Sequence, residues 1–275
     1  MTRILDYNGR EADRTVTVAS LRALKNQDSP IVQVTASTPE EAEAAEKAGV
    51  EMVVCMSDFV PAVREGSNRL FVTSAIDFTG AVTVDEILGV ALESLTAGAD
   101  AVITARRLEC VERLAAEDIP VMGHLGFVPK KSTLYGGIRG VGKTADEALG
   151  LWHKFRQLED AGAFAVECEL IPAEVMSVIN EQTGLTTISL GSGADADVMF
   201  LFMSDICGES ERKPRHARAY GDLATLYAKI DETRVEALQL FRQDVRAGGF
   251  PAASETIAVD QDELATFIAA LEREL

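Results

Sequence analysis

Short apolar runs alternate with capped helical segments along most of the chain, and this alternation restricts the fold more than any other feature. The run IVQVTA at 31–36 precedes a helical segment that has Thr38 as N-cap, Pro39 and Glu41 in its first turn, and Gly49 at its end. Similar apolar runs recur at 52–56, 70–73, 101–104, 120–125, 164–171, 186–190 and 198–203. Continuous apolar runs separated by helices are typical of parallel strands that are covered on both faces.

The number of strands selects among parallel α/β folds. Eight predicted strands in 275 residues favour a closed (β/α)8 barrel over an open doubly wound sheet, because such a barrel takes about 250 residues. We therefore predict a single barrel domain over residues 1–275, with a helical extension formed by the segments 223–246 and 261–275. One βα unit is short: segment 58–68 contains Pro61 and Gly66, so we expect a loop with at most one helical turn there.

Charge and cysteine usage exclude several classes of protein. The net charge is −18, from 44 acidic and 26 basic residues, which argues against binding to nucleic acid or to anionic membranes. No stretch approaches the roughly 18 apolar residues that a membrane span needs, and the first residues lack the apolar core of a secretory signal. Four cysteines without a C-x-x-C pair indicate reduced thiols, so we expect a cytoplasmic protein.

Two glutamates inside one predicted strand, in the run FAVECELIPAE, are the most informative candidates for chemistry. The two-residue period of a strand places Glu167 and Glu169 on one face, with Cys168 opposite. A carboxylate among apolar groups is costly unless it is paired, and its pKa can rise until it acts as a base near neutrality. The competing interpretation is a structural ion pair with a basic residue, for which the sequence offers Arg106, Arg107 and Arg139.

Further polar residues follow the other predicted strands, where a barrel collects its functional groups. His124 lies between glycines that allow a ligand to approach the backbone, although a hydrogen-bonded core histidine fits the same spacing. The Gly-Ser-Gly turn around Ser192 could hold an anion, although an ordinary turn is the simpler interpretation. Ser57, Asp58 and Asp77 follow the second and third strands.

Several motifs in a fixed order resemble the ketopantoate hydroxymethyltransferases. They are PVMGHLGFVPKK, YGGIRGVGKT, LEDAGAFAVECELIPAEV, ISLGSGADAD and VRAGGFP, and the similarity covers roughly Thr15 to Pro251. The resemblance implies a barrel of the phosphoenolpyruvate mutase/isocitrate lyase type and homo-oligomers built from pentameric rings, decamers among them. It also implies the transfer of a hydroxymethyl group from 5,10-methylenetetrahydrofolate to α-ketoisovalerate, which gives ketopantoate for pantothenate biosynthesis.

The same resemblance assigns site residues. The family's proton-transfer glutamate, counted back from Pro172, is Glu169. The predicted substrate-binding residues are Ser57, Asp58, His124 and Ser192.

The metal side of the family's site departs from the family pattern in this chain. In the family Mg²⁺ holds the 2-oxo acid and stabilises its enolate. The family's Gly-Asp-Ser matches Met56-Ser57-Asp58, its second metal-binding aspartate matches Ala75, and its Lys-x-Glu matches Ile103 and Ala105.

A magnesium site could be rebuilt from other carboxylates, since Mg²⁺ needs few protein ligands. The predicted ligands of that site are Asp58, Asp77 and Glu167. These differences leave two alternative functions open. One is a different lyase or aldolase that acts on another 2-oxo acid, and the other is a non-catalytic homologue.

Overall fold

The structure, a computed structural model, describes residues 2–26, 29–77, 79–210 and 214–274. Its contacts divide the chain into two compact units, Met1–Gly221 and Asp222–Leu275. The first unit contains the sheet and the second contains two helices. The prediction of one domain over residues 1–275 stays a prediction.

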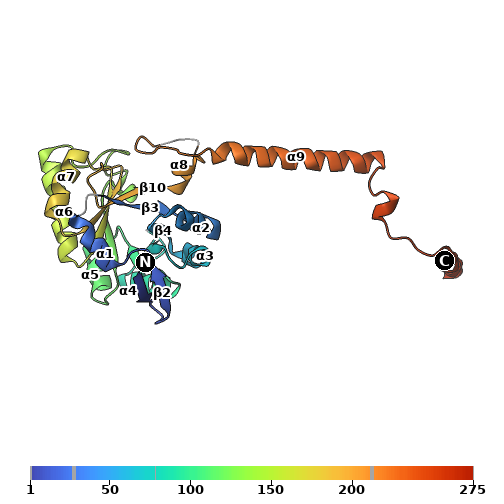
Figure 1. Cartoon of the computed structure of the whole chain (residues 1–275), viewed down its shortest axis with the longest axis horizontal. Coiled ribbons are helices and arrows are strands. Elements are labelled where there is room, and N and C mark those ends of the chain that lie inside the picture. Colours follow the sequence, from blue (N-terminus) through green and yellow to red (C-terminus); the bar gives the residue numbers. More distant parts are fainter. Residues whose placement is uncertain (1, 27–28, 78, 211–213, 275) are drawn as a thin grey trace. The chain divides into compact units, whose positions relative to one another are not determined.

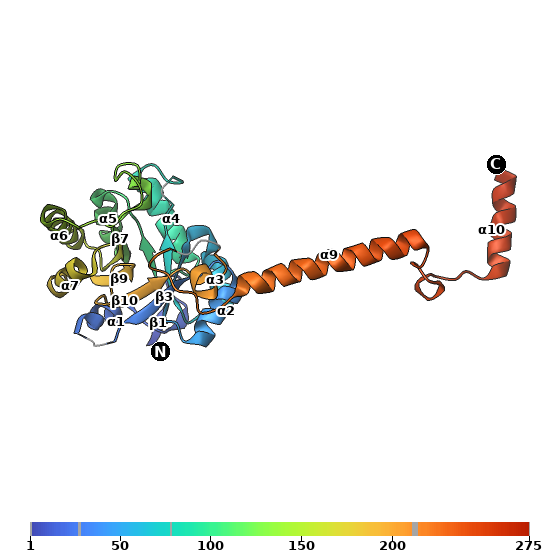
Figure 2. The ribbon, with the colours of Figure 1, turned by 90° about the horizontal axis from the view of Figure 1, so that it is seen from above.

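Eight parallel strands of the first unit close into a barrel, which confirms the predicted fold (Figures 1 and 2). Around the barrel the strand order is β10-β3-β4-β5-β6-β7-β8-β9. The strands are β3 (Ile31–Thr35), β4 (Met52–Met56), β5 (Phe71–Ala75), β6 (Ala101–Ile103), β7 (Val121–Gly126), β8 (Ala165–Glu169), β9 (Thr186–Leu190) and β10 (Val198–Leu201). Because all strands run in one direction, their carboxyl ends meet at one end of the barrel.

Helices cover the outside of the barrel, as Figure 2 shows. They are α2 (Pro39–Ala48), α3 (Val60–Gly66), α4 (Val84–Thr96), α5 (Leu108–Ala115), α6 (Ala145–Asp160) and α7 (Ala173–Gln182), and a short helix α8 (Met203–Cys207) follows β10. Threonine side chains accept a hydrogen bond from the backbone at the start of α2, α4 and α6, as the capping patterns predict.

Two hydrophobic layers hold the barrel together. Met52, Val54 and Phe71 belong to the group of side chains that fills the barrel interior. Val53 and Val72, at alternate strand positions, belong to the layer between the strands and the helices. This alternation is the two-residue period of a strand.

The short βα unit differs from the prediction. Instead of a loop with at most one turn, the chain forms a 3₁₀ turn, η2 (Ser57–Phe59), and then the seven-residue helix α3. Pro61 lies in the first turn of α3, where its missing N–H leaves no hydrogen bond unmade. Val60 and Val63 are fully buried, so the helix is held by packing.

The amino-terminal end of the barrel carries a hairpin that the sequence pattern did not predict. Strands β1 (Thr2–Leu5) and β2 (Glu11–Arg14) pair antiparallel, and a short helix, α1 (Val18–Arg22), follows them. Arg14, the last residue of β2, is buried, whereas the other residues of the hairpin are half-buried or exposed. Leu21 of α1 packs with the side chains of the barrel interior.

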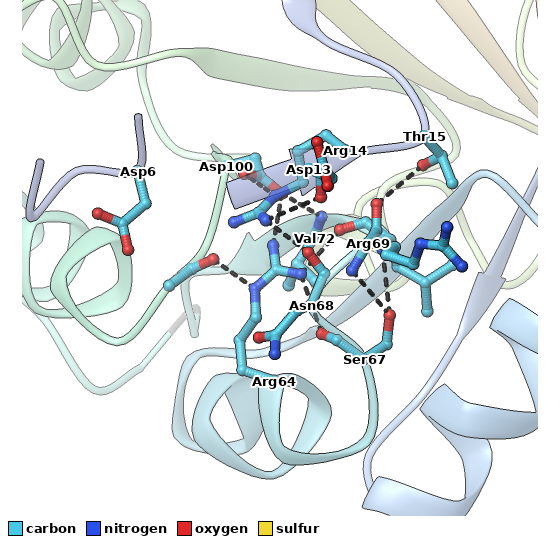
Figure 3. A network of polar contacts seen from close by, with 12 residues as sticks. Asp6, Asp13, Arg14, Thr15, Arg64, Ser67, Asn68, Arg69, Val72 and Asp100 are labelled. Carbon is cyan, nitrogen blue, oxygen red and sulfur yellow. Dashed lines mark hydrogen bonds and ion pairs between the residues drawn. The ribbon is translucent and has the colours of Figure 1, made fainter. Parts of the chain in front are cut away.

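Arg14 belongs to a buried ion-pair network, which Figure 3 shows. Its Nε donates to Asp100 Oδ1 at 2.7 Å, and Arg64 Nη2 donates to Asp100 Oδ2 at 2.5 Å. The backbone N–H of Val72 donates to the same carboxylate, and Arg14 Nη1 donates to the carbonyl oxygen of Asn68. Burial, and less strongly the positive charge of Arg14, lower the pKa of Arg64, while Asp100 opposes this shift. One aspartate thus holds two arginines at the base of the barrel.

The second unit contains the helix α9 (Leu223–Ala247), the turn η4 (Ala253–Glu255) and the helix α10 (Gln261–Glu274). Helix α9 is one continuous 25-residue helix (Figure 1), and none of its residues is buried. Large apolar side chains recur along one face of α9 and stay about half exposed: Tyr227, Ile230, Leu238, Phe241 and Val245. Within the described residues, no helix has the length and apolar character that a bilayer crossing requires.

Candidate functional site

A cavity of about 530 Å³ opens at the carboxyl ends of the barrel strands. Most of its wall is apolar, with contributions from Val54, Leu190 and Phe200. Among the described lining residues are four carboxylates and one histidine: Glu41, Asp77, His124, Glu167 and Glu169. Cavities of 300–1,000 Å³ with few polar groups are typical of small-molecule sites, and the position agrees with the barrel's functional end.

Glu167 and Glu169 both line this cavity, from neighbouring inward positions of β8. Cys168, between them, packs in the outer layer, as the two-residue period predicts. Leu170, the next residue, has a φ of 52°, which is uncommon for a residue with a branched side chain. The carboxyl end of β8 therefore places two carboxylates in one cavity and continues into a residue with a left-handed backbone.

His124 lies between these two carboxylates. Its Nε2 is 3.1 Å from Glu169 Oε2 and 3.1 Å from the carbonyl oxygen of Phe127. A carbonyl oxygen can only accept, so Nε2 carries a proton and donates it. The other ring nitrogen, Nδ1, is 3.9 Å from Glu167 Oε1, which is too long for a hydrogen bond but close enough for a charge interaction. The structure thus pairs the glutamates with the histidine, and not with an arginine.

The predicted arginine partners are engaged elsewhere. Arg139 pairs with Glu147 at 2.7 Å. Arg106 donates to the carbonyl oxygens of Ala81 and Val82, while Arg107 pairs with Glu109.

Burial and charge shift the pKa values of this cluster in one direction. Burial raises the pKa of Glu167, and the charge of Glu169 adds to this, while His124 opposes it. Burial alone would lower the pKa of His124, but the hydrogen bond to Glu169 and the charges of both glutamates raise it overall. The cluster therefore retains protons that the same groups would lose in water.

The ends of β4 to β6 contribute apolar side chains to the cavity wall, and Ala75 and Ala105 stand where the resemblance implies carboxylates. Met56, Ala75 and Ile103 at the ends of β4, β5 and β6 line the cavity, together with Ala105. None of these four side chains carries an oxygen or a nitrogen. The titratable cluster thus lies on β7 and β8, and the ends of β4 to β6 form an apolar side that Asp77, after β5, interrupts.

The predicted magnesium ligands do not come together in the described structure. Asp58 is exposed in η2 and is not among the residues that line the cavity. Asp77 lines the cavity and accepts a hydrogen bond from the Thr79 hydroxyl, whereas Glu167 lies beside His124. The described histidines, cysteines, aspartates and glutamates include no group of three that could hold a metal ion. These donors do not fit the magnesium site that the resemblance implies.

Ser57 and Ser192, the two predicted substrate-binding serines, are also absent from the described lining of the cavity. Ser57 lies at the start of η2 and is half-buried. Ser192 is 1% exposed: its hydroxyl donates to the carbonyl oxygen of Cys168 at 2.6 Å and accepts from the N–H of Ile171 at 3.0 Å. The hydroxyl therefore braces the end of β8, and its role toward a substrate stays a prediction.

The glycine-rich segment after β7 holds the backbone of Glu169. Gly126 has a φ of 88°, and a Cβ at this position would collide with the carbonyl oxygen of Glu169. The N–H of Phe127 donates to that same oxygen at 2.7 Å. The close approach of the two strands therefore depends on glycine.

Some cavity residues were not predicted. Glu41 was interpreted only as part of the capping box of α2, and its carboxylate does accept from the N–H groups of Ser37 and Thr38. Its contribution to the cavity follows from the short loop between β3 and α2. Phe202 and Met203 line the cavity after β10, and their place at the end of the predicted strand 198–203 was the available signal.

Comparisons with known proteins show the family of this chain. A family model described as ketopantoate hydroxymethyltransferase matches residues 53–253. The chain is 33% identical to the 3-methyl-2-oxobutanoate hydroxymethyltransferase of Pyrobaculum islandicum, over 81% of this chain and 92% of that one. It is 30% identical to the protein of the same name from Chloroflexus aurantiacus, over 91% and 95% of the two chains.

Solved structures share the fold at low sequence identity. Phosphonopyruvate hydrolase in complex with oxalate and Mg²⁺ matches with a TM-score of 0.51 and 15% identity, over 93% of this chain and 99% of that one. The lyase 2,3-dimethylmalate lyase, described as a member of the PEP mutase/isocitrate lyase superfamily, matches with a TM-score of 0.51 and 16% identity, over 94% and 95%. These likenesses agree with the predicted barrel type.

Proposed function

The chain belongs to the ketopantoate hydroxymethyltransferase family, and we propose that it transfers a hydroxymethyl group to the carbon next to the carbonyl of a 2-oxo acid. The proposed acceptor is α-ketoisovalerate, the donor 5,10-methylenetetrahydrofolate and the product ketopantoate, a precursor in pantothenate biosynthesis. One observation supports this most directly: Glu169 lines the cavity at the end of β8 and is hydrogen-bonded to His124.

In the proposed reaction the carboxylate of Glu169 removes the proton from C3 of the 2-oxo acid. The Nε2–H of His124, held by the Phe127 carbonyl, keeps this carboxylate in place, and the raised pKa of the imidazole favours its charged form beside Glu169. The folate donor supplies the one-carbon unit. Mg²⁺ remains a prediction from the resemblance: the described donors do not fit its site, so no step is assigned to a metal.

Proton exchange tests the proposed role of Glu169. Incubation with α-ketoisovalerate in D₂O should replace the C3 proton with deuterium, which NMR detects. Glu169→Gln should abolish exchange while the protein stays folded, because the amide cannot accept the proton. Glu174→Gln is the matched control: this glutamate is exposed in the first turn of α7 and should leave exchange unchanged.

A second candidate function is a lyase or aldolase reaction on a different 2-oxo acid. A third candidate is a role without catalysis. The apolar side formed by Met56, Ala75, Ile103 and Ala105 favours the second candidate, because it changes the chemistry that faces the substrate. Exchange or cleavage with another 2-oxo acid, but not with α-ketoisovalerate, would support it. No reaction of the folded protein with any 2-oxo acid would leave the non-catalytic role.

We also propose that the protein is a cytoplasmic homo-oligomer. The half-exposed apolar face of α9 supports self-association, since such a face is unfavourable in water unless it is covered. The four cysteines, Cys55, Cys110, Cys168 and Cys207, are free thiols, which agrees with a reducing compartment.

A further inference from the structure

A second, smaller cavity of about 210 Å³ lies beside the catalytic cavity. Its wall comes from the loop between β6 and α5, the first turns of α5, the end of β7 and the carboxyl-terminal half of α6. Ala105 and His124 line both cavities, so the smaller one adjoins the titratable cluster. Anything bound in it is a neighbour of the reacting groups.

The charges of the two cavities are opposite. Among the described lining residues, the smaller cavity has four basic side chains, Arg106, Arg107, Lys131 and Lys154, and no aspartate or glutamate. The described lining of the catalytic cavity has four carboxylates and no lysine or arginine. This cavity therefore gathers basic side chains in a chain whose net charge is −18.

The two arginines of this cavity have protein partners, whereas the two lysines have no acidic partner among the described residues. Arg106 is held by the carbonyl oxygens of Ala81 and Val82, and Arg107 pairs with Glu109. Lys131 and Lys154 form no ion pair with any described aspartate or glutamate. Burial and the positive charge of Lys154 lower the pKa of Lys131. The fold thus keeps two lysines close together against their mutual repulsion, which an anionic ligand would relieve.

We propose that this pocket, defined by Arg106, Arg107, Lys131 and Lys154, binds a carboxylate group of a substrate whose reacting end lies in the catalytic cavity. The proposal rests on the proposed function, because both proposed substrates carry carboxylates. A volume of about 210 Å³ is below the about 300 Å³ at which pockets for whole ligands begin, so it suits one end of a molecule. The pocket also supplies lysine and arginine side chains for binding an anion, which the described lining of the catalytic cavity does not contain.

The carboxylate has two possible sources, the 2-oxo acid itself and the glutamyl tail of the folate. Calorimetric titration of the whole protein with α-ketoisovalerate, and separately with folinic acid, separates them. The analogue 5-formyltetrahydropteroic acid, which differs from folinic acid only in lacking the glutamyl residue, is the matched ligand. Each titration is repeated with the double variant Lys131→Gln/Lys154→Gln and with Lys47→Gln, an exposed lysine of α2 that pairs with Glu43.

The double variant should lose about tenfold or more in affinity for the ligand whose carboxylate occupies the pocket. If the folate tail binds there, wild-type protein should bind folinic acid more tightly than 5-formyltetrahydropteroic acid, and the double variant should not. If the 2-oxo acid binds there, only its affinity should fall. Lys47→Gln should bind like wild type in every case.

Three results would overturn the proposal. One is unchanged affinity of the double variant for both carboxylates, and another is the absence of binding of either carboxylate to folded wild-type protein. The third is a lower melting temperature of the double variant without ligand, since this would show that the lysines stabilise the folded protein through partners of its own. If the proposed function fails but the pocket binds carboxylates, the result differs: carboxylate binding still depends on the lysines, but C3 exchange is absent.

Discussion

At the scale of single residues, the site depends on how closely Gly126 approaches Glu169. Gly126→Ala adds a Cβ that collides with the carbonyl oxygen of Glu169, and it strains a backbone with a φ of 88°. We expect a loss of roughly 1–3 kcal/mol in unfolding free energy from the collision, in addition to the backbone strain. A displaced Glu169 should also reduce kcat on the order of 100-fold. Urea unfolding and the C3 exchange rate measure the two effects.

Gly136→Ala is the matched control for this prediction. Gly136 has a φ of 74°, but nothing lies within 4 Å of an added Cβ. The variant should therefore show only the left-handed backbone cost of roughly 1–2 kcal/mol, with unchanged exchange. Equal kcat losses in both variants would contradict the role given to the contact with Glu169.

The cluster of His124, Glu167 and Glu169 also predicts a pH dependence of stability. The folded-state pKa values of His124 and Glu167 are both raised, so both groups bind protons more tightly in the folded state. Their contributions are complete below the unfolded values of 6.5 and 4.5 and are lost as the pH rises through the raised values. The unfolding free energy should therefore fall with rising pH, and this fall should be smaller in Glu167→Gln.

Chemical denaturation over a pH series checks this dependence. Glu174→Gln replaces an exposed glutamate on α7 and should follow the wild-type curve. Parallel curves for wild type and Glu167→Gln would show that the buried carboxylate does not titrate as we infer.

At this scale the sequence predicted the candidate side chains of the site but not their hydrogen-bond partners. The two-residue period and the apolar surroundings predicted that Glu167 and Glu169 share a face, and the structure places both in the cavity. The bond of Glu169 to His124 joins different strands, so no local pattern encodes it. The hydrogen bonds of Ser192 to Ile171 and Cys168 were not predicted for the same reason, because they depend on the packing of β8 against the turn after β9.

At the scale of elements, the strands and long helices could be predicted because each has a strong local signal. Helix α3 could not be predicted, because Pro61 and Gly66 indicate breaks in a helix. Pro61 starts the helix, while Gly66 ends it where α2 passes: a Cβ there would collide with the backbone of Pro39. Hairpin β1–β2 is mostly exposed and polar, so it lacks the apolar period that reveals a strand.

The ion-pair network at the base of the barrel belongs to this scale, since it ties β2 and α3 to the start of β6. Asp100→Asn removes the one carboxylate that Arg14 and Arg64 share and leaves two buried guanidinium groups uncompensated. We expect a loss of roughly 3–5 kcal/mol in unfolding free energy, measured by urea denaturation. Asp146→Asn, in the exposed first turn of α6, should change it by less than about 0.5 kcal/mol. A similar small effect of both variants would show that the network does not stabilise the barrel.

At the scale of the whole molecule, the apolar face of α9 predicts self-association. Leu238 and Phe241 remain 67% and 52% exposed. Leu238→Asp places a charge on this face and should shift the protein toward smaller species, as sedimentation velocity would show. Gln239→Asp makes the same change one residue away, outside the apolar face, and should leave the assembly intact. If Leu238→Asp also leaves the size distribution unchanged, α9 is not part of the interface.

The ion pairs at the base of the barrel have a consequence for how such a protein can change over time. Asp100 and its two arginines lie at the amino-terminal end of the strands, whereas the cavity lies at their carboxyl ends. Substitutions around the cavity therefore leave this ion-pair network unchanged. The carboxylates that the resemblance implies at Ser57, Ala75 and Ala105 can therefore be exchanged without loss of the fold, so that the chemistry of the cavity can change while the barrel persists.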